Sequence, residues 1–216
     1  MHNNEILNLF RRIFSAILGF LPLIFWILLI FSLESASVAV LTIVCALIHE
    51  TGHEIFILMK TGRINIPSGR VNGFVIRERS ARMMSYGDEA MLYLSGPLTN
   101  IAAAVASLPL RALIGDYAEL IVAMNIATAL SSLIPVEGYD GYGALKCIMH
   151  EHLSDSTATR ALSIISFTLT AALSTVALYI MDRLGEGYWI FAIFTASLIG
   201  AISKALKMQK TEKNEN

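Results

Sequence analysis

The sequence predicts an all-α polytopic membrane protein with about six transmembrane helices and a small membrane-associated β-hairpin between the second and the third. Three observations lead to this prediction. The chain of 216 residues is 55% hydrophobic and only 15% charged, whereas a soluble domain is roughly 45 to 50% apolar and roughly 25% charged. Its apolar residues gather into six long runs, and one connection between them is much longer than the others.

Each apolar run approaches the about 20 consecutive residues that a helix needs to cross a bilayer core. The first run is about twice as long as the apolar region of a signal peptide and no small-x-small cleavage site follows it, so we expect it to remain in the mature protein. The runs define a membrane domain over residues 13–205, flanked by an N-terminal segment 1–12 and a polar tail 206–216. They occupy residues 13–33, 36–59, 90–110, 117–134, 161–181 and 188–205.

The positions of the basic residues predict the orientation, because short loops rich in Lys and Arg stay in the cytoplasm. With six spans and a cytoplasmic N-terminus, all of the 16 Lys and Arg residues except Arg111 and Arg183 fall on the cytoplasmic side. We therefore expect a multi-pass protein of the cell membrane with both termini in the cytoplasm. The net charge of -1 gives no indication of a nucleic-acid partner.

The connection over residues 60–89 is long, since packed helices are commonly joined by about 2 to 8 residues. Apolar residues alternate there with Pro67, Gly69 and Gly73, which is typical of two short strands around turns. We expect a hairpin within residues 64–76 at the cytoplasmic membrane surface.

The second run contains the motif His-Glu-Thr-Gly-His at residues 49–53. On a helix, His49 and His53 lie on one face, about 40° apart around the axis and about 6 Å apart along it, so both imidazoles can bind one zinc ion. Glu50 then lies beside the metal, where it can take a proton from a water molecule and pass it to a leaving amine.

The apolar setting of this motif favours a functional interpretation. A charged side chain in a membrane span costs on the order of 2.5 to 3.5 kcal/mol, so such residues are expected to have a function. The alternative is that these side chains only form hydrogen bonds between helices. Glu54, four residues after Glu50, either lines a polar entrance or extends towards the cytoplasmic interface.

A hydrolytic zinc site needs a third protein ligand beside an open position for water. Asp140 is the first candidate, because it follows the fourth run in the stretch 133–141, where Pro135 stops a helix and two glycines permit close backbone approach. Glu137 is the rival ligand. The remaining histidines lie in polar segments and are expected to be solvated rather than ligating: His2, His150 and His152.

The third run contains Gly-Pro-Leu-Thr-Asn at residues 96–100. Gly96 and Pro97 can let another backbone approach, and Asn100 can supply a polar contact inside the bundle. The same residues can also be interpreted as the start of a helix, with Pro97 in its first turn.

Together, the motif at 49–53, the stretch 96–100 and the Pro-x4-Asp-Gly stretch at 135–141 resemble the site-2 protease family of intramembrane zinc metalloproteases. The resemblance covers residues from about 36 to about 141. It implies that His49, His53 and Asp140 are zinc ligands and that Glu50 is the catalytic acid and base. It also implies that the hairpin holds substrate in an extended form.

Six spans with a cytoplasmic site look most like the sporulation-type branch of that family, whose members process a membrane-associated pro-sigma factor. The family usually has Asn three residues before the proline, where this chain has Ser132, and Asn125 is a stand-in on nearly the same face. Asn100, Ser132 and Asn125 are therefore the substrate-binding candidates. The expected partners are a membrane-protein substrate, the bilayer and a regulatory membrane protein.

Two other functions remain open from the sequence. A metal-binding transporter needs the ligands but no general base, and transporters often show two related halves, which are not evident here. A catalytically inactive membrane scaffold is the second alternative.

Overall fold

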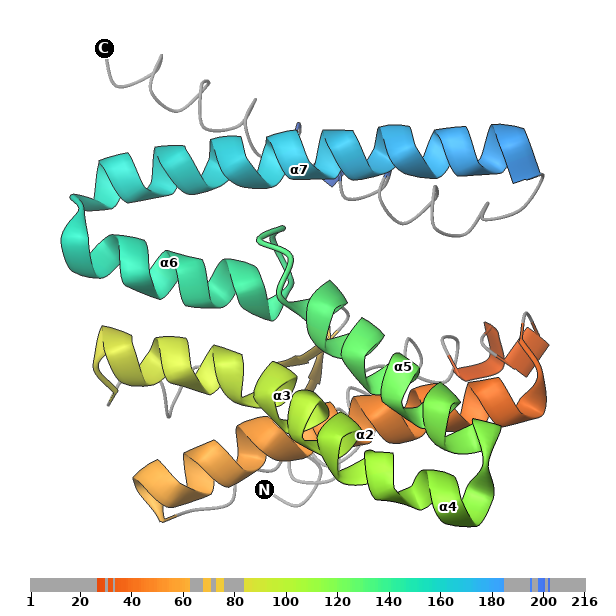
Figure 1. Cartoon of the computed structure of the whole chain (residues 1–216). Coiled ribbons are helices and arrows are strands. Elements are labelled where there is room, and N and C mark those ends of the chain that lie inside the picture. Colours follow the sequence, from red (N-terminus) through yellow and green to blue (C-terminus); the bar gives the residue numbers. More distant parts are fainter. Residues whose placement is uncertain are drawn as a thin grey trace, which may run out of the picture. The chain divides into compact units, whose positions relative to one another are not determined.

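The computed structural model describes residues 27–29, 31, 32, 34–62, 68–70, 73–75, 84–184, 195, 198–200 and 202, which are mainly helical (Figure 1). The helical class that the sequence predicts is confirmed in this part of the chain. The chain divides into two units, Met1–Ser132 and Leu133–Asn216. Each unit is described by itself below.

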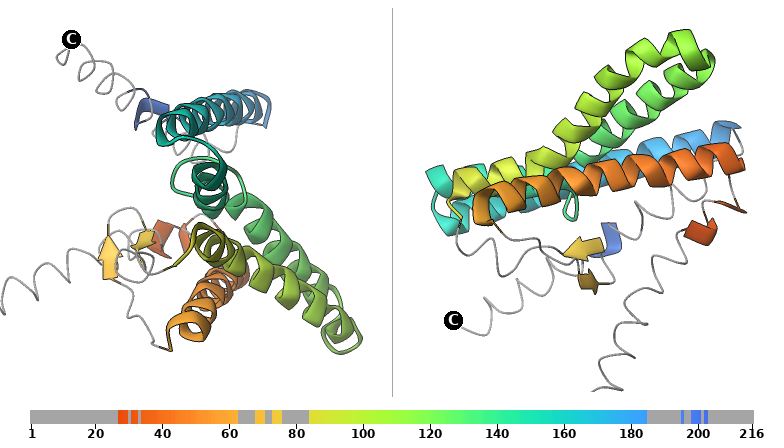
Figure 2. Two further views of the ribbon diagram at one scale, coloured as in Figure 1. Left: turned by 90° about the vertical axis from the view of Figure 1, so that its left-hand side faces the viewer. Right: turned by 90° about the horizontal axis from the view of Figure 1, so that it is seen from below.

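The first unit is built on three helices that contact one another, α2 (Ala36–Thr61), α3 (Tyr86–Ser107) and α5 (Asp116–Ser132), and Figure 2 shows them from two further sides. Between α2 and α3, Ile57 and Leu92 are buried against each other, with Phe56 and Met84 packed around them. This core fixes the side of α2 that faces α3, which is the side that bears the two histidines of the motif.

Helix α2 begins and ends at residues suited to those positions. The Ser35 hydroxyl accepts a hydrogen bond from Val38 N–H, which satisfies one of the free amides of the first turn. At the other end, Gly62 takes a left-handed conformation with φ of 65° and donates its N–H to Leu58 O. Glycine adopts this conformation without the steric cost that a side chain brings.

Helix α3 begins earlier than the Gly-Pro sequence indicates. Ser85 caps it by accepting a 3.1 Å hydrogen bond from Asp88 N–H, and Asp88 and Glu89 place negative charge at the positive end of the helix. Pro97 therefore lies in the interior of α3. The interpretation of Gly96 and Pro97 as a helix start is wrong, because the capping residue Ser85 lies twelve residues before Pro97.

A short connection joins α3 to α5. It consists of the 3-10 helix η2 (Leu108–Leu110), the single turn α4 (Arg111–Ile114) and Gly115, whose φ of 57° lets the chain reverse. Helices α3 and α5 consequently run side by side, as Figure 1 shows.

Between α2 and α3 lie two strands of three residues each, β1 (Ser68–Arg70) and β2 (Gly73–Val75). They pair antiparallel, with Ser68 opposite Val75 and Arg70 opposite Gly73. Most of the expected hairpin segment 64–76 lies outside the described residues. Its extent and its position at the membrane surface stay predictions.

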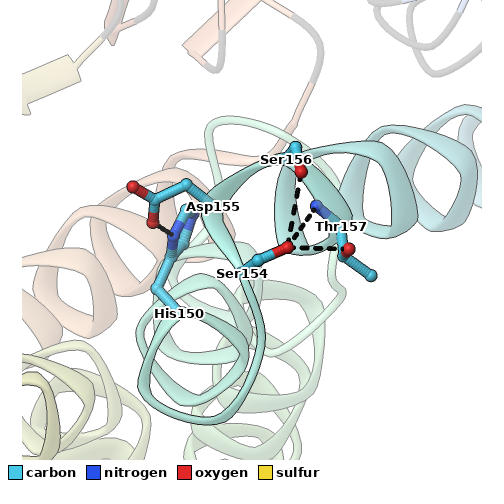
Figure 3. Close-up of polar contacts among 5 residues, drawn as sticks. All are labelled: His150, Ser154, Asp155, Ser156 and Thr157. Atoms are coloured by element: carbon cyan, nitrogen blue, oxygen red, sulfur yellow. Dashed lines mark hydrogen bonds and ion pairs between the residues drawn. The ribbon is translucent and has the colours of Figure 1, made fainter.

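The second unit starts with an irregular loop, residues 133–139, followed by α6 (Asp140–His152) and α7 (Asp155–Leu184), which contact each other as an antiparallel pair. Ser154 begins α7 by accepting a 3.4 Å hydrogen bond from Thr157 N–H. Beside it, His150 Nδ1 lies 2.8 Å from Asp155 Oδ1, so that the two helix ends are joined (Figure 3).

Three helical segments are long and apolar enough to cross a membrane, Ala36–Thr61, Tyr86–Ile114 and Asp155–Arg183. They match the second, third and fifth predicted runs. Helix α5, in the fourth run, has 17 residues and is about 25 Å long, shorter than the about 30 Å of a bilayer core. The first and sixth runs lie largely outside the described residues, and the total of six spans stays a prediction.

Candidate metal site

His49 and His53 lie on the buried side of α2, with only 8% and 6% of their surfaces exposed. They are separated by one helical turn, and their Nε2 atoms lie 3.2 Å apart. The rings are nearly perpendicular, at 80°, with centroids 4.9 Å apart. The four-residue spacing therefore brings the two ring nitrogens to one point, as the sequence predicts.

The other nitrogen of each ring is held by an acceptor. His53 Nδ1 lies 2.8 Å from the carbonyl oxygen of Leu92, and because a carbonyl can only accept, this nitrogen carries the proton. His49 Nδ1 lies 2.8 Å from Asn100 Oδ1 and donates to it in the same way. In neutral imidazoles with this arrangement both Nε2 atoms are acceptors, and each presents a lone pair to the other.

Two lone pairs that face each other repel, and a cation bound between them removes this repulsion. Zinc binds histidine nitrogen at about 2.0 to 2.1 Å with tetrahedral angles, so two nitrogens on one ion lie about 3.3 to 3.4 Å apart. The observed 3.2 Å separation of the Nε2 atoms agrees with this geometry. Fixing Nδ1–H on a carbonyl or amide oxygen is also how metal-binding histidines are usually oriented. The two histidines therefore fit a zinc ion.

Two glycines let α2 and α3 approach closely at this point. A Cβ atom on Gly96 of α3 would lie 2.5 Å from His53 Nε2 and 2.7 Å from His49 Nε2, so the absent side chain leaves the space beside both nitrogens. A Cβ atom on Gly52 of α2 would lie 2.6 Å from Ser95 O and would also overlap Thr99 Oγ1. The expected close approach at Gly96 is confirmed.

The sequence did not predict a role for three residues at the contact between α2 and α3. Gly52 was treated only as a variable position of the motif, although a glycine inside a helix indicates close packing. Ser95 donates a 2.6 Å hydrogen bond to Leu92 O, the carbonyl that also holds His53. No side-chain pattern identifies Leu92, because it acts through its backbone.

The two carboxylates near the histidines are both half-buried on α2. Glu50 follows His49 directly, and Glu54 follows His53 directly, one turn further along. Glu50 is thus the neighbour of His49 in the sequence. Its role as catalytic acid and base stays a prediction.

The three substrate-binding candidates are all placed in the first unit. Asn100 is fully buried and donates from Nδ2 to Cys45 O at 3.0 Å and to Asn125 Oδ1 at 2.9 Å, which confirms its expected polar contact inside the bundle. Asn125 is also buried and donates to Ile121 O at 3.0 Å. Ser132, the last residue of α5, donates to Ala129 O at 2.9 Å. Their contact with substrate stays a prediction.

Asp140 lies in the second unit as the first residue of α6, and its side chain is half-buried. The loop before it is shaped by both expected glycines. Gly138 has a φ of 102°, and a Cβ atom on Gly141 would overlap the carbonyl oxygen of Leu133. Glu137 N–H donates a 2.9 Å hydrogen bond to Ser166 Oγ of α7. The loop therefore has a defined backbone, while the choice of third ligand stays a prediction.

His150, one of the histidines expected to be solvated, is instead joined to Asp155 at the turn between α6 and α7 (Figure 3). Its neighbour in the H-x-H sequence, His152, is the last residue of α6. His2 lies outside the described residues.

Comparison with known proteins agrees with this arrangement at the level of the fold. No protein-family model and no curated protein sequence matches the chain. A solved structure described as "Site-2 Protease from Methanocaldococcus jannaschii" matches it with a TM-score of 0.57 over 88% of this chain and 87% of that chain, at 18% sequence identity. The chain has the fold of a site-2 protease. This fold and the three apolar helical segments indicate a membrane protein.

Proposed function

We propose that the protein is an intramembrane zinc metalloprotease, which hydrolyses a peptide bond in or next to a transmembrane segment of another membrane protein. One observation supports this most strongly. The Nε2 atoms of His49 and His53 converge to 3.2 Å while both Nδ1 atoms are held by acceptors. This pair lies on a helix that is long and apolar enough to cross a membrane.

The proposed ligands are His49, His53 and Asp140. Two imidazoles and one carboxylate form a ligand set found in zinc hydrolases, which keep a fourth position open. Asp140 is preferred over Glu137 because it is half-buried, whereas Glu137 is exposed. A zinc ion held there would polarise the carbonyl of the scissile bond and acidify a water molecule.

Glu50 is proposed to move the proton. Its carboxylate accepts the proton that the attacking water loses, and it then donates that proton to the nitrogen of the leaving amine. The half-buried position of Glu50, directly after a proposed ligand, suits this exchange. A transit site for metal ions would need the ligands but no such base.

Substrate must present an extended segment, because the peptide bonds of a membrane helix are shielded by their own hydrogen bonds. The edge of the hairpin that contains β1 and β2 is proposed to pair with the unwound segment and so to satisfy its backbone groups. With both termini in the cytoplasm, cleavage would occur near the cytoplasmic leaflet and release a cytoplasmic product. A pro-sigma factor is the kind of substrate that the sporulation-type resemblance suggests.

The direct test measures zinc content and cleavage for the wild type, Glu50→Gln and Thr51→Val, with single-span membrane proteins as substrates. Glu50→Gln removes the proton acceptor but no ligand, so zinc content should persist while cleavage falls by at least about 100-fold. Thr51→Val is the matched control. Thr51 is exposed, and its hydroxyl donates to Leu47 O of its own helix, at 2.7 Å.

Two outcomes of this test would contradict parts of the proposal. Normal cleavage by Glu50→Gln would remove Glu50 from the mechanism. A wild type that binds zinc and moves it across vesicles without cleaving any candidate would favour a transporter.

A further inference from the structure

We propose that Asn100 and Asn125 form a hydrogen-bonded relay that fixes His49 in the tautomer able to bind metal. This inference rests on the metal site of the proposed function but assigns the two asparagines a positioning part instead of substrate contact. The relay joins α5, α3 and α2, and all its members lie in the first unit.

The orientation of the Asn100 amide is determined by its surroundings. Its Nδ2 group has two protons, and both have acceptors, Cys45 O at 3.0 Å and Asn125 Oδ1 at 2.9 Å. Oδ1 must then face His49 Nδ1, 2.8 Å away. Because Oδ1 can only accept, His49 carries its proton on Nδ1 and leaves the lone pair on Nε2.

Asn125 is oriented by the backbone of α5. Its Nδ2 donates to Ile121 O at 3.0 Å, which leaves Oδ1 to accept from Asn100. The hydrogen bonds of the relay therefore all have the same direction: His49 donates to Asn100, Asn100 donates to Asn125, and Asn125 donates to Ile121 O. The last acceptor is a backbone carbonyl, which can only accept. Both asparagines are buried, with exposed fractions of 0% and 1%, so water cannot readily replace a lost partner.

The two histidines differ in how they are held. His53 donates to Leu92 O, a backbone carbonyl with a fixed polarity. His49 donates to a side-chain amide, whose two ends can exchange by rotation. Only His49 therefore needs further residues to determine its tautomer. Without the Asn125 Oδ1 acceptor, Cys45 O alone would hold the Asn100 amide in this orientation. A larger share of the molecules would then turn Nδ2 towards His49 and carry the His49 proton on Nε2.

The test compares zinc affinity by chelator competition in purified full-length Asn125→Leu, Asn125→Asp and Thr128→Val. Asn125→Leu removes the acceptor and should weaken zinc binding by about tenfold or more, the scale on which partners of metal ligands act. Asn125→Asp loses the donor to Ile121 O but keeps an oxygen acceptor for Asn100, so its zinc affinity should fall less than that of Asn125→Leu. Thr128→Val is the control on α5, because the Thr128 hydroxyl donates to Met124 O of its own helix, at 2.8 Å, and not to a member of the relay.

A second measurement reads the tautomer without metal or substrate. Nitrogen chemical shifts of His49 in the metal-free protein should show the proton on Nδ1 in the wild type and at least partly on Nε2 in Asn125→Leu. Asn125→Ser, which is too short to reach Asn100, replaces Asn125→Leu if that variant does not fold. It carries the same expectation.

The relay is overturned if Asn125→Leu or Asn125→Ser is folded and retains both wild-type zinc affinity and the Nδ1 tautomer. This result would not contradict the proposed function, which is zinc binding and proteolysis. Conversely, a wild type that binds zinc but cleaves nothing would overturn the proposed function while the effect of Asn125 on affinity still supports the relay.

Discussion

Gly96 of α3 lies so close to the histidine pair of α2 that a Cβ atom there would stand 2.5 Å from His53 Nε2. It would also stand 2.7 Å from His49 Nε2. One missing methyl group therefore both allows the two helices to pack and leaves room where a metal ion would meet the nitrogens.

Gly96→Ala should consequently abolish zinc binding. The added methyl must displace the histidine rings or separate the helices, and overpacking of this kind costs about 1 to 3 kcal/mol. We expect zinc content near zero and a lower unfolding temperature in detergent.

Gly87→Ala is the matched control on the same helix, since the nearest atom to its added Cβ would be Ser85 Oγ at 4.0 Å. This variant should keep its zinc and change the free energy of unfolding by no more than about 1 kcal/mol. Normal zinc content in Gly96→Ala would show that the space beside the nitrogens is not needed.

Substitution of the two acidic candidates should identify the third ligand. Asp140→Asn should lower zinc affinity strongly, because a neutral amide is a weaker ligand than a carboxylate. Glu137→Gln should retain affinity, because the loop is anchored through the backbone N–H of Glu137 rather than its side chain. Chelator competition on both variants measures the difference, and the reverse ranking would transfer the ligand assignment to Glu137.

Replacing His150 should affect stability only. Its pair with Asp155 is partly exposed, with 88% of the Asp155 side chain accessible, and such pairs contribute about 0 to 1 kcal/mol. His150→Ala should therefore lower the unfolding temperature slightly and leave zinc content unchanged. Loss of zinc in this variant would place a ligand at the turn between α6 and α7.

The sequence predicted the parts of the site that follow from local spacing. The four-residue interval between His49 and His53 determines their common face on any helix, and Gly138 and Gly141 indicated a tight loop. The partners of the Nδ1 atoms were harder to predict. Leu92 acts through its backbone carbonyl, which every residue has, so the residue type does not indicate this role. Asn100 was recognised as polar and buried but not as the partner of His49.

The start of α3 shows how two local signals can compete. Gly96 and Pro97 are typical of a first turn, and the sequence interpretation allowed that reading. Helix α3 begins after Ser85, with Asp88 three residues later, so the Gly-Pro pair lies in its interior and Gly96 lies beside the histidines. The sequence interpretation did not include Ser85, although a serine followed three residues later by an acidic residue is a first-turn signal.

X-ray absorption at the zinc edge of the purified protein tests the central claim most directly. We predict one zinc ion per chain with two imidazole nitrogens at about 2.0 to 2.1 Å and the remaining ligands oxygen, and no zinc in His49→Ala or His53→Ala. A protein that cleaves its substrate without zinc, or a zinc ion with sulfur at about 2.3 Å that persists in both variants, would contradict it.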